Sequence, residues 1–371
     1  MRKIVLFGLF FLFGCGEKAQ EYRMPDFPET VRGEVELLGE DLPYYYVHEV
    51  FVYDSYLIVA GIPLRQGVHI YDRHSGALLK SVVRLGFGPN EIGGIDGVSL
   101  DAATGDLFLI DRELSHSLKF NINDVMANKI PQIEKDAHEF GPVNWIEAVY
   151  QLDDDKLLLR SATSPMATIS SRERFEIYDG ASKIWSSNDF PIQDMLGVLN
   201  YKNGIGACGA LSKDRKLFFF GTEHNGATLE CFEVASDRLV PRWTKYLIEP
   251  RYDWATGEEA KNRIRGFSDV SVSEGLLLTV IGDDRQHWVR SVCVFDFEGN
   301  PVKRIVIDSD EYNIFKVCMN EQGEMYAVVT TNKYDFYLAR IREAGPTEYV
   351  IPQERIDHFT PEAVKNPASY Q

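Results

Sequence analysis

The chain alternates between short polar turns and strands in which apolar residues occupy every second position. Six segments of the 371-residue chain share one plan: an alternating strand, a polar turn and a strongly apolar strand. Aromatic and β-branched residues at period two, interrupted by Asp, Gly and Asn, are typical of β-hairpins. Helical periodicity is nearly absent. The pattern therefore predicts an all-β chain built from repeated hairpins.

The hairpins recur at a regular interval. Their second strands are expected to begin near Tyr56, Asp106, Lys156, Lys216, Leu276 and Glu324, which lie 48 to 60 residues apart. A third alternating segment follows each hairpin, and a fourth follows most of them. Because every unit orders its strands in the same way, this period favours a radial propeller over a sandwich. We predict a six-bladed β-propeller with four-stranded antiparallel blades at residues 33–352, followed by a C-terminal tail at 353–371.

Two segments are candidates for the strand that closes the ring. "GEVELLG" at residues 33–39 and "TEYVI" at residues 347–351 both have the apolar alternation of a strand. Either could pair with the last unit. The pattern alone does not choose between them.

A glycine-rich loop joins the first unit to the second. Gly86 and Gly88 can adopt backbone angles that are closed to other residues, and Pro89 restricts one dihedral angle in the same turn. Glu91 is placed to accept hydrogen bonds from turn amides that would otherwise be buried without partners. These features predict a structural joint between units, with a ligand site at the loop as the alternative.

The same stretch carries a family resemblance. "LGFGPNE" and the following "GVSLDAATGDLFLIDRELSHSLKF", within residues 85–120, resemble one NHL-type propeller repeat. Together with the N-terminal segment described next, the chain is similar to the TolB-like six-bladed propeller lipoproteins of Gram-negative bacteria. The other units match by period alone. The resemblance implies a fold and a location, and it leaves the activity open because one fold hosts many functions.

The first fifteen residues have the pattern of a targeting segment. Arg2 and Lys3 precede an apolar run at residues 4–13 that is too short to span a bilayer. The following Gly-Cys, ending at Cys15, resembles a bacterial lipobox. This predicts a lipoprotein signal peptide at 1–14, acylation of Cys15 and a flexible tether at 15–32, with an ordinary secretory signal as the alternative. We expect an outer-membrane lipoprotein of the cell envelope, facing either the periplasm or the cell surface.

Charge and cysteine content restrict the partners. The chain has 56 acidic and 39 basic residues, a net charge of −17, which repels phosphate backbones and argues against nucleic acid. We expect a monomer whose membrane contact is the lipid. Cys208 and Cys231 fall on the first and third strands of one unit, beyond disulfide reach, and Cys293 and Cys318 fall on different units. We therefore predict buried thiols without disulfides.

The innermost strands of a propeller line a central channel, and residues near their starts converge at one end. The candidates for this channel mouth are His48 or Glu49, Asp96, Asn144 or Trp145, Asn200 or Tyr201, Asp269 and Asn313. Carboxylate and carboxamide oxygens from several blades could ring a cation such as Ca²⁺. The alternative is a wet, polar mouth that carries no metal.

Two functions follow from this candidate site. The leading one is a binding module for an unknown protein or small-molecule ligand, with no cofactor and no catalytic residue. The alternative is a Ca²⁺-dependent hydrolase, which resembles the lactonases and esterases built on six-bladed propellers, with Asp96, Asp269 and Glu49 as its key residues. No serine-hydrolase elbow, Walker loop or His-Glu-x-x-His motif occurs in the sequence.

Overall fold

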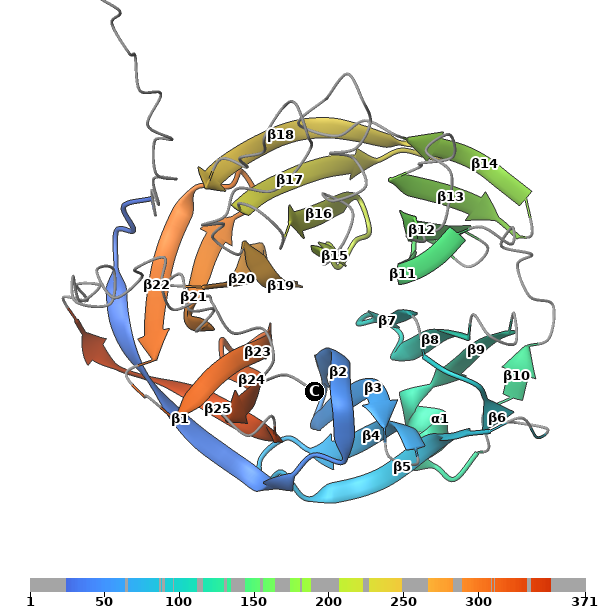
Figure 1. The fold of residues 1–371 in the computed structure, drawn as a ribbon, viewed down its shortest axis with the longest axis horizontal. Coiled ribbons are helices and arrows are strands. Elements are labelled where there is room, and N and C mark those ends of the chain that lie inside the picture. The colour runs from blue at the N-terminus through green and yellow to red at the C-terminus, as the bar shows by residue number, and fades with distance from the viewer. Residues whose placement is uncertain are drawn as a thin grey trace, which may run out of the picture.

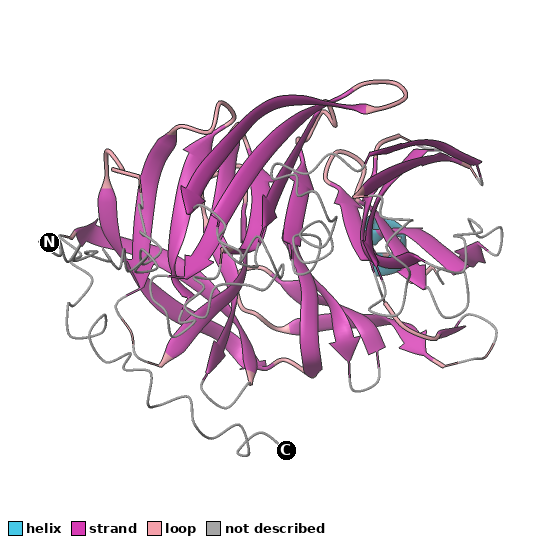
Figure 2. Cartoon of the chain, turned by 45° about the horizontal axis from the view of Figure 1, so that its top comes forward, coloured by secondary structure: helices cyan, strands magenta, loops and turns pink. Residues whose placement is uncertain are grey.

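The protein is all-β and its sheets are arranged in a propeller-like ring (Figure 1). The computed structural model describes residues 25–63, 66–86, 88, 91–95, 97–111, 116–129, 132–134, 144–153, 156–163, 174–180, 182–187, 207–222, 227–248, 266–282, 289–307, 309, 311–331 and 335–347. Within these residues the regular structure is β-strand apart from one short helix (Figure 2). No helix among them is long and apolar enough to cross a membrane.

Four of the sheets each come from one continuous stretch of chain. The first, five-stranded sheet contains β2 (Tyr44–Tyr53), β3 (Tyr56–Pro63), β4 (Gln66–Asp72), β5 (Leu78–Leu85) and β6 (Glu91–Ile92). The second contains β7 (Gly97–Asp101), β8 (Asp106–Asp111), β9 (His116–Asn121) and β10 (Gln132–Glu134). The third contains β11 (Asn144–Gln151), β12 (Lys156–Thr163), β13 (Phe175–Asp179) and β14 (Ser182–Ser187). The fourth contains β15 (Ala207–Leu211), β16 (Leu217–Thr222), β17 (Ala227–Val234) and β18 (Leu239–Ile248).

The remaining sheet is eight-stranded and joins the N-terminal strand of the chain to its C-terminal strands. One half contains β19 (Phe267–Ser273), β20 (Leu276–Gly282), β21 (Val289–Asp296) and β22 (Pro301–Ile307). The other half contains β23 (Tyr312–Met319), β24 (Met325–Thr331), β25 (Phe336–Pro346) and β1 (Thr30–Asp41). Hydrogen bonding therefore divides the ring into five sheets rather than the six separate ones that were expected.

The N-terminal strand β1 is the reason for this difference. It pairs antiparallel with β25, where Leu38 faces Leu338, and parallel with β22, where Val31 faces Ile305. Of the two candidate closing segments, the one at 33–39 thus supplies a strand next to β25, and this strand begins at Thr30, before the expected start of the domain at residue 33. Residues 348–351 of the other candidate lie outside the described part of the chain.

The apolar second strands owe their composition to burial on both faces. In β3, Leu57, Ile58, Val59 and Ala60 are all fully buried. Because side chains alternate across a strand, Ile58 and Ala60 pack toward the second sheet, while the other two pack toward β24 and β25. The expected starts of β3, β8, β12 and β20 are confirmed, and those of β16 and β24 are displaced by one residue. Local alternation therefore located these hairpins well.

The core is distributed between neighbouring sheets instead of lying in one place. Six buried apolar clusters each join one group of strands to the next around the ring. One of them, containing Val292, Ile305, Val317 and Ala327, joins the two halves of the eight-stranded sheet. Face-to-face packing of this kind is how propeller blades bury their surfaces.

A single helical turn follows β9. Helix α1 (Ile122–Met126) begins after Asn121, whose side chain accepts a hydrogen bond of 3.0 Å from the amide of Asn123. Ile122 and Val125 are buried in the cluster between the first and second sheets. Strand β9 ends at Asn121 because this capping bond favours a helical start.

The glycine-rich loop folds around the carboxylate of Glu91. Its Oε2 accepts a 2.8 Å hydrogen bond from the amide of Gly88, and its Oε1 lies 3.3 Å from Nε of Arg84. Gly86 has a φ of +155°, and a Cβ there would lie 2.0 Å from Glu91 Oε2. β6 then pairs in parallel with β5. These contacts support a joint between the first two sheets; Pro89 lies outside the described residues.

Candidate functional site

The inner strand of each group lies next to the centre of the ring (Figure 1). These strands are β2, β7, β11, β15, β19 and β23, and each is hydrogen-bonded to a neighbour on one side only. Each also contacts the inner strands before and after it, and β23 contacts β2 to complete the circle. Their free edges therefore direct backbone polar groups toward the axis, where they need water or a ligand as partners.

A cavity of about 690 Å³ occupies the region enclosed by these strands. It extends from Glu49 to the turns that connect first and second strands, including Asp54, Asp101, Arg215 and Glu321. The apolar part of the cavity wall includes Phe51, Leu100 and Phe297. This size and mixed lining are typical of sites for small molecules.

Glu49, which lines the cavity, shares one lysine with a second carboxylate. The ammonium of Lys316 is 3.1 Å from Oδ1 of Asp269 and 3.5 Å from Oε1 of Glu49. The other oxygen of Asp269 accepts a 2.8 Å hydrogen bond from the amide of Val317. The three side chains come from β2, β19 and β23, so the cluster forms only when the ring closes.

Enclosure changes the protonation of these groups. Burial raises the pKa of Glu49 from its ordinary 4.5 to about 7; the charge of Lys316 opposes this rise and that of Asp269 adds to it. Burial acts to lower the pKa of Lys316, but Asp269 and Glu49 outweigh it and raise that pKa well above its ordinary range. Burial and Lys316 lower the pKa of His48 to about 4. The cluster therefore keeps Lys316 charged while Glu49 titrates near neutrality.

The raised pKa of Glu49 predicts a specific dependence of stability on pH. Between about pH 4.5 and 7 the folded state binds more protons at Glu49 than the unfolded state, so ionisation costs stability as the pH rises. Relative to Glu49→Gln, the wild-type free energy of unfolding should fall by about 1–3 kcal/mol across that window, because one pKa unit is worth about 1.4 kcal/mol and partial solvent access weakens the effect. Urea unfolding of both proteins at several pH values tests this; parallel curves would contradict it.

The ring closure brings together only part of the predicted channel mouth. Glu49 and Asp269 converge as expected, whereas Asp96, Asn200 and Tyr201 lie outside the described residues. Asn144 and Trp145 lie on β11, His48 on β2 and Asn313 on β23. Sequence reasoning missed Lys316, although a lysine between Phe315 and Val317 on an apolar strand is itself unusual and was the available signal.

Lys316 also changes the expectation for a cation. Its ammonium occupies the position between the two carboxylates that the calcium hypothesis assigned to a metal. Among the residues that the structure describes, no three His, Cys, Asp or Glu side chains are grouped to hold a metal ion. The described carboxylates at this point therefore face a protein cation.

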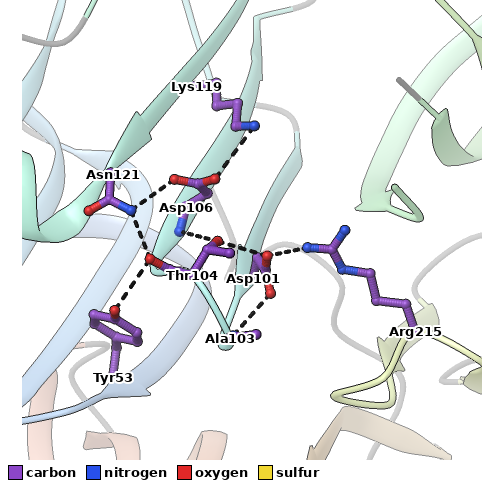
Figure 3. Close-up of polar contacts among 8 residues, drawn as sticks. All are labelled: Tyr53, Asp101, Ala103, Thr104, Asp106, Lys119, Asn121 and Arg215. Carbon is purple, nitrogen blue, oxygen red and sulfur yellow. Dashed lines mark hydrogen bonds and ion pairs between the residues drawn. The ribbon is translucent and has the colours of Figure 1, made fainter. Parts of the chain in front are cut away.

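The opposite end of the cavity is crossed by ion pairs from one turn. Arg215, in the turn between β15 and β16, pairs with Asp101 of the second sheet and so reaches past the third (Figure 3). Lys213 of the same turn pairs with Glu321 and lies 3.4 Å from Glu274. Arg215 has a left-handed φ of 57°, a conformation that costs a non-glycine residue about 1 kcal/mol or more. The turn is therefore held in a strained form across this end of the channel.

Asp101 is fixed for this contact by its own hairpin. Its Oδ1 accepts a 3.0 Å hydrogen bond from the amide of Ala103, and its Oδ2 accepts a 2.7 Å bond from the hydroxyl of Thr104 (Figure 3). The carbonyl of Thr104 accepts bonds from Asn121 at 2.8 Å and from the hydroxyl of Tyr53 at 3.3 Å. Asp101, the partner of Arg215, is therefore held in place by its hairpin, and Thr104 of that hairpin links the second sheet to Tyr53 of the first.

The cysteines are structural in this arrangement. Cys208, Cys231, Cys293 and Cys318 are buried and form no disulfide with one another, as predicted. Burial raises the pKa of Cys231 to about 12, which disfavours the reactive thiolate. Cys15 lies outside the described residues.

Comparison with known proteins identifies similar folds but assigns the chain to no family. No protein-family model and no curated protein matches the chain. Among solved structures, a Bacteroides fragilis protein described as exported is similar with a TM-score of 0.56 and 13% identity, over 85% of this chain and 99% of that one. A member of the DUF4221 family from Bacteroides vulgatus is similar with a TM-score of 0.53 and 11% identity, over 87% of this chain and 100% of that one.

An enzyme has a similar fold as well. A gluconolactonase from Xanthomonas campestris aligns with a TM-score of 0.50 and 11% identity, over 88% of this chain and 99% of that one. At such identities the likeness concerns the fold alone, and one propeller fold serves many functions. The chain is thus similar to β-propeller proteins of differing roles.

Proposed function

We propose that this chain is an extracytoplasmic, lipid-anchored propeller that binds a small molecule in its central cavity. The observation that carries the proposal is the cavity of about 690 Å³, which combines apolar walls with the carboxylate of Glu49, whose partner Lys316 also pairs with Asp269. Strands surround these groups and hold them in place. Ordering of the site on binding would therefore reduce the affinity for a ligand only slightly.

The proposal includes a propeller of six blades. The six inter-sheet clusters and the closed circle of inner strands support treating the eight-stranded sheet as two blades joined by β1. A TolB-like relationship would follow from that count, from the NHL-type repeat and from the lipobox.

The location rests on the N-terminal sequence. An apolar run followed by Gly-Cys at Cys15 supports export and acylation, and the similar Bacteroides fragilis protein is described as exported. In cells, Cys15→Ala should abolish labelling with a fatty-acid analogue and move the protein out of the membrane fraction. Unchanged labelling would remove the anchor from the proposal.

Binding in the cavity can be tested without knowing the natural ligand. A fragment library with neutral, acidic and basic members is screened by ligand-observed NMR against the wild type and two variants. Ala210→Trp places an indole at a residue that lines the cavity and also packs against a buried cluster, so its melting temperature is measured first, whereas Ala77→Trp adds the same side chain at an exposed position away from the cavity. We expect hits that Ala210→Trp loses and Ala77→Trp keeps. If the library yields no such hits, the cavity does not bind small molecules.

A cation-dependent hydrolase is the second candidate, favoured by one observation. Glu49 titrates near neutral pH inside the cavity, as a general base requires. The ammonium of Lys316 beside it opposes a cation at the same point. If calcium binds there, excess Ca²⁺ should raise the melting temperature by several degrees relative to chelator, and Asp269→Asn should abolish the shift. An unchanged melting temperature would contradict a calcium site at this position.

A further inference from the structure

Besides Nε of Arg73, three uncharged polar atoms of residues that line the cavity have no hydrogen-bond partner among the described residues. They are Oγ of Ser99 on β7, Oε1 of Gln151 on β11 and Oγ of Ser271 on β19. Ser99 is 9% exposed and Gln151 is 6% exposed. A buried polar atom left unsatisfied lowers the stability of the folded protein, so three of them on residues that line one cavity call for an explanation.

These atoms offer a particular kind of recognition. A serine hydroxyl both donates and accepts, and a glutamine Oε1 accepts. Rotation about one side-chain bond carries a serine hydroxyl between staggered positions, so both hydroxyls can turn toward the cavity space. Inner strands β7 and β11 contact each other, which places Ser99 and Gln151 on adjoining walls. The nearby half-buried Phe51 supplies an apolar surface.

The charged lining argues against an anionic ligand. The described basic residues that line the cavity already have carboxylate partners: Arg73 with Glu324, Lys213 with Glu274 and Glu321, and Arg215 with Asp101. Acidic lining residues outnumber them: Glu49, Asp54, Asp101, Asp214, Glu274 and Glu321. An incoming phosphate or carboxylate would therefore meet repulsion without an uncommitted cation in the described wall.

We propose that the cavity binds a neutral, polyhydroxylated molecule such as a mono- or disaccharide. Its hydroxyl groups exchange hydrogen bonds with Ser99, Gln151 and Ser271, and an apolar face of the molecule packs on Phe51. This assignment rests on the proposed function, because it names the class of ligand for the same cavity. Because these atoms have no partner in the absence of a ligand, the free protein is less stable than it would be with apolar side chains at the same positions.

The variants Ser99→Ala and Gln151→Met separate recognition from structure. Each removes a polar atom that lacks a partner, so the melting temperature should stay the same or rise. Binding should weaken tenfold or more, since a ligand hydrogen bond is lost. The matched control is Ser273→Ala on β19, because Ser273 also lines the cavity but already donates to the carbonyl of Asn320 at 3.4 Å. It should change affinity less than twofold.

The probes are glucose, galactose, N-acetylglucosamine and cellobiose, compared with glucuronate and glucosamine, titrated by calorimetry into the chain without its signal peptide. We expect at least one neutral sugar to bind, with glucuronate at least tenfold weaker than glucose. Binding confined to the amine or the acid would overturn the ligand class and leave cavity binding intact. If no neutral sugar binds in a way that depends on Gln151 while Ala210→Trp still loses fragment hits, the ligand class fails and cavity binding stands; if there are no such fragment hits either, both proposals fail. A lowered melting temperature in Ser99→Ala and Gln151→Met would show that the atoms serve the fold.

Discussion

Replacement of Lys316 by methionine is expected to lower the free energy of unfolding by about 3–5 kcal/mol at mildly alkaline pH. Lys316 is 6% exposed and is the positive charge beside both Asp269 and Glu49. Methionine keeps much of the side-chain volume but leaves two carboxylates close together in a protein interior. Urea unfolding measures the loss. Because the pKa of Glu49 is raised to about 7, this carboxyl takes up a proton in acid, and the loss should shrink as the pH falls below that value.

Two further variants make this test specific. Lys129→Met removes an exposed lysine whose ion pair with Asp124 spans 2.6 Å, and it should cost less than about 0.5 kcal/mol. Adding Glu49→Gln and Asp269→Asn to Lys316→Met should recover part of the stability, because no buried charge is then left without a partner. If the single variant is as stable as the wild type, or if its loss does not depend on pH, the cluster is not the buried ion network described above.

Truncation of the chain to residues 42–371 is expected to abolish cooperative unfolding. This removes β1, which separates β22 from β25 and contributes Val31 and Leu38 to two of the clusters. The outer edges of β22 and β25 would then face water with unpaired backbone groups, and the ring would lose its closure. Circular dichroism during heating and gel filtration would report the loss as a broad transition and aggregation.

A longer chain is the matched control for this truncation. Residues 25–371 keep all of β1, so their melting temperature should lie within about 2 °C of that of the chain that starts at Cys15. Leu38→Ala gives a milder test in the full domain: the side chain is 6% exposed, and its truncation should cost about 2–4 kcal/mol. A cooperative, soluble 42–371 fragment would show that β1 does not close the ring.

The candidate site was accessible to sequence reasoning only in part. Glu49 and Asp269 were predicted to converge because both lie on inner strands, and strand order follows from the repeat. The partner between them was not predicted, because the register of β23 decides whether Lys316 or a neighbour faces the channel. The ion pair between Arg215 and Asp101 was equally hidden, since it links turns of sheets that are not adjacent in the ring.

The sequence by itself determined the hairpins, their turns and the order of strands within each group. These features depend on alternation between neighbouring residues, and the predicted starts at Tyr56, Asp106 and Leu276 are confirmed for that reason. The tertiary structure alone decided that β1 lies between β22 and β25 and that Lys316 neutralises two carboxylates. Apart from the pair of Lys316 with Asp269, such contacts join positions more than 200 residues apart, and several segments have the local pattern to make them. Only the packing of the complete ring selects one arrangement, because it buries apolar faces and charged groups together.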